Sequence, residues 1–132
     1  MGGHGALTIA MKNPEKYKSV SAFAPICHPI NCPWGKKAFS NYLGEEEETW
    51  KEYDATLLML ERGPFPWKIL VDQGGGDDFL SGGQLQPEAL QNAMTEKKQE
   101  GSVEIHEDYD HSYFFNSSFI EKHVNFHADA LK

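Results

Sequence analysis

Three short segments of the sequence carry residues that could perform acid–base and nucleophilic chemistry. His111 lies in Tyr-Asp-His-Ser-Tyr, and Asp77 lies in a glycine-rich run that follows the apolar stretch 68–71. The chain opens with Met-Gly-Gly-His-Gly-Ala-Leu, residues 1–7. A carboxylate that accepts from Nδ1–H of an imidazole fixes its tautomer and stabilises the imidazolium formed when the ring takes up a proton. The three segments therefore predict parts of a nucleophilic hydrolase site.

The acid is open among several aspartates, because Asp72 and Asp78 flank Asp77 in the same acidic loop. A loop aspartate commonly shapes a turn, and a histidine before a helix can be a capping or surface residue. Asp77 and His111 nevertheless each follow a predicted strand. Loops at the carboxyl ends of parallel strands hold side chains in position while leaving them accessible. This placement favours Asp77 and His111 as acid and base.

The opening segment has the small residues that a nucleophile elbow needs, because its strand-to-helix turn is sharp and closely packed. In the pattern G-x-S-x-G, Gly2 or Gly3 would be the last glycine, and the nucleophilic serine would stand immediately before Met1. The amide of Met1 would then donate one oxyanion hydrogen bond, worth roughly 3–4 kcal/mol in the transition state. Taken alone, the segment is equally a plain helix start.

Alternating elements must position these residues. The pattern predicts strands at 17–24, 68–71 and 103–106, and helices at 3–12, 35–43, 50–60, 87–98 and 112–131. Asp54 is a candidate N-cap inside the helix 50–60. Such alternation predicts a parallel sheet with helices on its faces. Only three strands are available, fewer than a parallel sheet usually has.

Composition narrows the functional classes. The 132 residues suffice for one domain, and a net charge of −8 argues against nucleic-acid binding and docking on anionic membranes. No apolar run approaches the roughly 18 residues of a membrane span. Met1 is followed by glycines rather than by a signal peptide. We therefore expect a cytoplasmic protein or one that lacks its true N-terminus. The glutamate run Glu45–Glu48 is interpreted as a solvated face or a helix start.

Metal binding is not expected. A zinc site at Cys27 and Cys32 would need two more ligands nearby, so these residues are interpreted as free structural thiols. His123 and His127 are four apart on the last predicted helix, a spacing that can present two nitrogens to zinc. No third ligand is marked near them, and we expect both to be solvated. His4 is interpreted as structural.

The chain resembles the S-formylglutathione hydrolase (esterase D) family. The matching segments span nearly the whole chain in order: 1–7, 19–26, 32–39, 53–56, 72–74 with Asp77 and 79–80, and 109–113. The resemblance implies the C-terminal half of an α/β-hydrolase fold, about three parallel strands with flanking helices, as a single partial domain over 1–132. It implies a cytosolic serine thioesterase that hydrolyses S-formylglutathione to formate and glutathione, the second step of glutathione-dependent formaldehyde detoxification. It also implies carboxylesterase activity, no cofactor and a homodimer.

Matched residue by residue, the resemblance places the family's acid on Asp77, two before Phe79, its base on His111 and its oxyanion amide on Met1. It places Trp34 as a wall of the acyl pocket, while a packed loop tryptophan is the alternative. The serine and everything before it are absent. A second hypothesis is therefore a truncated, catalytically inactive or interaction-only form of such a hydrolase, and we expect the 132 residues alone to be inactive.

Overall fold

A three-stranded parallel sheet forms the centre of the molecule. The computed structural model describes residues 1–132, and its strands are β1 (Ser19–Phe23), β2 (Lys68–Gly74) and β3 (Gly101–His106), in the order β1-β2-β3. Both pairings are parallel. The carboxyl ends of all three strands therefore lie at one edge of the sheet. The α/β class expected from the alternation of elements is confirmed.

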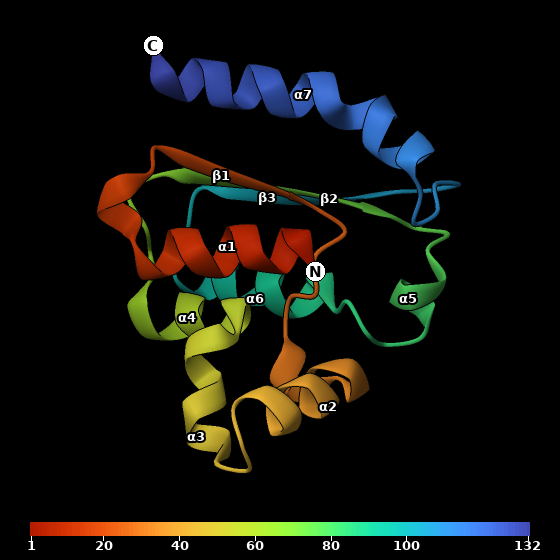
Figure 1. Ribbon diagram of the computed structural model, residues 1–132. Coiled ribbons are helices and arrows are strands. Elements are labelled where there is room, and N and C mark those ends of the chain that lie inside the picture. The colour runs from red at the N-terminus through yellow and green to blue at the C-terminus, as the bar shows by residue number, and fades with distance from the viewer.

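Helices cover both faces of this sheet. Figure 1 shows α7 (Tyr113–Leu131) along one face, and α1 (Gly2–Lys12), α4 (Ala55–Arg62) and α6 (Pro87–Glu96) against the other. The main apolar core lies on the face with three helices and holds side chains such as Leu7, Leu58, Ile69 and Leu90. In α1, Leu7, Ala10 and Met11 are buried at the spacing that places apolar residues on one helix face.

The connections contain shorter elements. These are α2 (Pro33–Tyr42), α3 (Glu47–Trp50), α5 (Asp78–Ser81) and three single 3₁₀ turns at Pro14–Lys16, Pro29–Asn31 and Lys51–Tyr53. The expected solvated helix start at Glu45–Glu48 is confirmed, because α3 begins there and all four glutamates are exposed.

Two predicted elements depart from the structure by more than two residues at an end. The single helix expected over 50–60 is wrong: α3 ends at Trp50, and α4 starts after Asp54. The Asp54 carboxylate accepts from the amide of Leu57 at 3.0 Å, so this N-cap begins a new helix rather than sitting inside one. Strand β2 also continues beyond Val71 to Gly74, which places Asp72 in the sheet rather than in a loop.

No helix has both the length and the apolar character needed to cross a lipid bilayer.

Candidate active site

Asp77 and His111 meet at the carboxyl edge of the sheet. Asp77 follows β2 and caps α5, while His111 lies between β3 and α7. His111 Nδ1 is 2.7 Å from Asp77 Oδ2. The Asp77 side chain is fully buried, whereas 43% of the His111 side chain is exposed. The pair thus combines a carboxylate shielded from water with an imidazole that remains accessible.

Backbone contacts between the two loops hold this pair together. The amide of Gly75 donates to the His106 carbonyl at 2.7 Å, and that of Gly76 donates to the Tyr109 carbonyl at 2.9 Å. At Gly74, a Cβ atom would collide with the Tyr109 carbonyl oxygen. Glycine at this position therefore allows the loop that carries Asp77 to lie directly against the loop that carries His111.

The Asp77 carboxylate accepts three hydrogen bonds. Besides His111, the amide of Phe79 donates to Oδ1 at 2.8 Å, and Gln73 Nε2 donates to Oδ2 at 2.9 Å. Gln73 is not among the site residues predicted from the sequence. Its signal there is a glutamine at the end of an apolar strand, four residues before Asp77. Asp78, the neighbouring alternative, is exposed in α5 and makes no side-chain hydrogen bond or ion pair.

An apolar cavity of about 340 Å³ adjoins His111. The ring of Phe79 lies between two others, edge-on to His111 with centroids 4.9 Å apart and tilted against Trp34 at 4.8 Å. Trp34 lies in the first turn of α2 and lines this cavity, as does Met1. The remaining lining residues are His4, Ala24, Ile26, Pro29, Gly35, Ala38, Phe39 and Leu85.

The start of α1 lies at this cavity as well. Met1 is the N-cap of α1 and is 86% exposed. A Cβ at Gly3 would come within 2.9 Å of the Phe23 carbonyl oxygen, so a small residue lets α1 approach the end of β1 closely. His4 also lines the cavity, and its Nε2 lies 2.6 Å from the Tyr53 carbonyl oxygen, a contact that ties α1 to the turn before α4.

Comparison with known proteins identifies the family. The family model for Esterase, described as "Putative esterase", matches residues 1–126. The chain belongs to the Esterase family. It is similar to curated S-formylglutathione hydrolases, with 53% identity to that of Paracoccus denitrificans and 56% to that of Mus musculus, each over 131 residues. Both alignments cover 99% of this chain but only 46% of the relative.

A solved structure gives the same result for the fold. The S-formylglutathione hydrolase from Agrobacterium tumefaciens superposes with a TM-score of 0.93 at 43% sequence identity, over 99% of this chain and 47% of that one. The resemblance stated from the sequence is confirmed, and this esterase-family chain corresponds to the C-terminal portion of such hydrolases. It has three parallel strands with flanking helices, matching α/β-hydrolase esterases over about half of their length.

A second aspartate–histidine cluster lies between the sheet of this esterase-family chain and α7. Asp72 Oδ2 is 2.7 Å from His123 Nε2, and Asp72 Oδ1 is 2.7 Å from His106 Nε2 and 2.8 Å from Lys122 Nζ. Burial alone would raise the pKa of Asp72, but hydrogen bonds from these three side chains outweigh it and hold the pKa well below its usual range. The Asp72 carboxylate therefore bonds to these three side chains and not to His111.

Two histidines of α7 continue this cluster toward β1. Ser21 Oγ lies 2.8 Å from both His123 Nδ1 and His127 Nε2, and His127 Nδ1 lies 2.7 Å from Ser19 Oγ. The expectation that both histidines are solvated is wrong, because His123 is 2% exposed and His127 is partly buried. They face the sheet because Asp72, Ser19 and Ser21 give them polar partners there.

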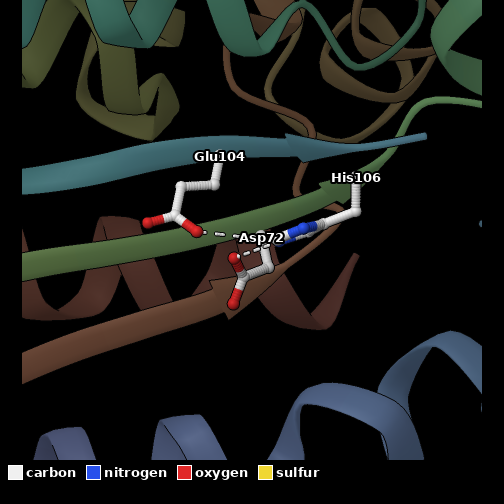
Figure 2. A group of neighbouring side chains, drawn as sticks. All are labelled: Asp72, Glu104 and His106. Atoms are coloured by element: carbon white, nitrogen blue, oxygen red, sulfur yellow. Dashed lines mark hydrogen bonds and ion pairs between the residues drawn. The ribbon is translucent and has the colours of Figure 1, made fainter.

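Three side chains of this region have the residue types of a metal site. Figure 2 shows Asp72, Glu104 and His106 gathered on the face of the sheet that α7 covers. Their potential ligand atoms all lie within 4.8 Å of one another. Lys122 Nζ, however, lies 2.8 Å from Asp72 and 2.7 Å from Glu104. The Lys122 ammonium group supplies the positive charge that balances the Asp72 and Glu104 carboxylates. The cluster is therefore an ion-pair network.

The two cysteines are separate, buried and free. Cys32 Sγ accepts from the amide of Gly35 at 3.4 Å and caps α2. Burial, followed by the charges of Glu88 and Asp54, raises the pKa of the Cys27 thiol far above its usual range. A thiol held protonated in this way is a poor nucleophile and a poor metal ligand.

Proposed function

We propose that Asp77 and His111 are the acid and the base of a serine thioesterase site that hydrolyses S-formylglutathione to formate and glutathione. The observation that carries this proposal is the 2.7 Å contact between His111 Nδ1 and a buried Asp77 carboxylate beside an apolar cavity. The similarity to S-formylglutathione hydrolases supports the substrate. Simple carboxylic esters are proposed as further substrates, and formaldehyde removal in the cytoplasm as the setting.

In the proposed reaction, His111 Nε2 takes the proton of a serine hydroxyl as the oxygen attacks the thioester carbonyl. Asp77 keeps the other ring proton on Nδ1 and stabilises the imidazolium. When the C–S bond breaks, the imidazolium returns a proton to the glutathione sulfur. His111 then takes a proton from water, and the resulting hydroxide attacks the formyl ester. As the ester bond breaks, His111 returns that proton to the serine oxygen, which restores the free serine and releases formic acid, and the acid ionises to formate.

Met1 and Trp34 have supporting roles in this proposal. A peptide amide at position 1 would lie at the start of α1, where unpaired N–H groups favour developing negative charge. Trp34, packed on Phe79 at the cavity, would form a wall that accepts a small acyl group. Its exposed position in the first turn of α2 favours this role over that of a packed loop tryptophan.

The nucleophile is proposed to come from outside these residues. The chain spans 46% of the curated relatives it matches. Within it, Asp77 is the one hydrogen-bond partner of the His111 ring. The second candidate is therefore that the chain by itself is a catalytically inactive or interaction-only form of such a hydrolase. A homodimer of the complete protein is proposed from the family resemblance alone.

A joined protein tests both candidates. The chain is fused after the upstream residues of the Paracoccus denitrificans relative, which aligns over 99% of this chain. We expect the fusion to hydrolyse S-formylglutathione, the His111→Ala fusion to lose at least about 10³-fold in kcat/KM, and the chain alone to give no turnover. A folded but inactive fusion, or a fusion whose activity survives His111→Ala, would refute the assignment. Turnover by the chain alone, lost in His111→Ala, would refute the second candidate.

A further inference from the structure

Gln73 is a fully buried polar residue near the end of β2 whose amide is only half satisfied. Its Nε2 donates to Asp77 Oδ2 at 2.9 Å and to the Gly74 carbonyl at 3.1 Å. Its Oε1 is buried without a hydrogen-bond partner, and no other side-chain polar atom in the molecule has that status. A buried acceptor without a donor lowers the stability of the fold, so such atoms are rare in native proteins and often have another role.

The neighbours of Gln73 fix the orientation of its amide. An ionised carboxylate and a peptide carbonyl can only accept, so the atom that faces Asp77 and Gly74 must be the nitrogen with its two N–H groups. Turning the amide over would satisfy neither neighbour and would place oxygen against oxygen. The lone Oε1 is thus the consequence of directing both donors to the residues that hold the loop.

A second buried glutamine shows the contrasting arrangement. Gln99 Oε1 accepts from the Phe65 amide at 2.6 Å, and its Nε2 donates to the carbonyls of Trp67 and Glu100 at 2.7 and 3.0 Å. Gln99 satisfies both ends of its amide and joins backbone segments, as a structural glutamine does. Gln73 instead donates one hydrogen bond to Asp77 Oδ2, the same carboxylate oxygen that contacts His111 Nδ1.

From this contrast we propose that Gln73 is a positioning residue that holds the Asp77 carboxylate in the rotation that faces His111. The amide of Phe79 fixes Oδ1, and Gln73 fixes Oδ2, so the carboxylate cannot turn about its Cβ–Cγ bond. His111 then meets an acceptor that is already in place. The inference deepens the proposed function, on which it rests for the catalytic role of Asp77 and His111.

The test compares Gln73→Met with Gln99→Met in the 132-residue chain, since methionine has a similar length but no N–H group. Solvent exchange of the His111 Nδ1 proton is followed by NMR, and unfolding by urea. In Gln73→Met we expect the His111 Nδ1 proton to exchange about tenfold faster, which corresponds to the loss of about one hydrogen bond. We expect the urea midpoint to be unchanged or raised, because the unpaired Gln73 acceptor is gone. In Gln99→Met we expect a lower midpoint and an unchanged His111 proton.

The outcomes separate the inference from the proposed function. An unchanged His111 proton in Gln73→Met overturns the positioning role and leaves the thioesterase proposal standing, as does a His111 proton that Gln99→Met perturbs equally. If Gln73→Met fails to fold, Gln73→Leu is measured in its place; failure of both shows that Gln73 is needed for folding and overturns the role. An inactive fusion protein together with faster exchange in Gln73→Met would instead refute only the proposed function.

Discussion

Strand β2 and the loop after it supply two aspartates, and each is paired with a histidine in a different environment. The Asp77–His111 and Asp72–His123 contacts are both 2.7 Å long, and both carboxylates are fully buried. The difference lies in the imidazoles. The His111 side chain is 43% exposed beside a cavity, whereas that of His123 is 3% exposed and stacks on Phe23 at 3.8 Å.

Charge balance separates the two pairs further. Lys122 neutralises Asp72, and its own pKa is raised because hydrogen bonds to Asp72 and Glu104 outweigh the effect of burial. Asp77 has no ionic partner other than His111. Its charge therefore remains available to stabilise a proton on His111, which is what a general base requires. The same pair of residue types is thus proposed to serve chemistry at the edge of the sheet, and it forms part of a buried network beneath α7.

Removing the carboxyl charge of each pair in the fusion protein should separate these roles most clearly. We expect Asp77→Asn to lower kcat/KM by roughly 10⁴-fold, because the amide favours the wrong histidine tautomer. Asp72→Asn should leave kcat/KM of the folded fraction within about threefold, since the side chains of Asp72 and Asp77 share no hydrogen-bond partner. Steady-state kinetics on S-formylglutathione measures kcat/KM of both variants. Equal losses of kcat/KM would contradict separate roles for the two aspartates.

Stability should show the reverse order. Asp72→Ala leaves Lys122 and two histidines without their buried partner, and we expect a loss of about 3 kcal/mol in the free energy of unfolding. Asp78→Ala is the matched control, because Asp78 is exposed and unpaired, and it should change stability by less than about 0.5 kcal/mol. Urea unfolding of the 132-residue chain gives both values. A loss below about 1 kcal/mol for Asp72→Ala would show that the network under α7 is not structural.

The contact between Asp77 and His111 could be predicted because the carboxyl ends of neighbouring parallel strands meet at one edge. The network under α7 could not. Asp72, Gln73 and Gly74 look like a turn, so the predicted strand ended at Val71, although all three are buried in β2. Once Asp72 belongs to the sheet, a polar helix face must cover it.

The pattern of residues on α7 also gives no sign of the network. His123 and His127 are polar residues at a spacing that fits a solvated face, and only the partners supplied by β1 and β2 reverse that interpretation. The break between α3 and α4 has a simpler cause. The sequence prediction places the candidate cap Asp54 inside one helix, whereas a cap at Asp54 starts a new helix at Ala55.

Two glycines test whether close packing of loops positions Asp77 against His111. Gly74→Ala places a methyl group against the Tyr109 carbonyl, and we expect it to destabilise the chain by about 1–3 kcal/mol. Gly5→Ala in α1 meets open space and should stabilise it by about 0.5–1 kcal/mol. Urea midpoints measure both changes. If Gly74→Ala is as well tolerated as Gly5→Ala, the loop is not held by this close approach.

The smallest expected effect is a pH dependence of stability from the α7 network. Burial, followed by the charge of His123, lowers the pKa of His127 below 6.5. The unfolded chain then binds this proton more readily, so the contribution of His127 is present above about pH 6.5 and is lost as the pH falls through the folded pKa. The urea midpoint should fall less in His127→Gln than in the unchanged protein as the pH is lowered from 7.5 to 5. An equal fall in both proteins would contradict this assignment.

The tautomers of His111 and His123 most clearly distinguish an accessible base from a buried structural imidazole. Hydrogen bonds to the carboxylates predict that neutral His111 carries its proton on Nδ1, facing Asp77, while His123 carries a proton on Nε2, facing Asp72. Nitrogen-15 NMR of the imidazole rings in the 132-residue chain distinguishes these states. The account predicts opposite tautomers, with His111 Nε2 unprotonated and open to a nucleophile. A proton on His111 Nε2 in the neutral ring would contradict it.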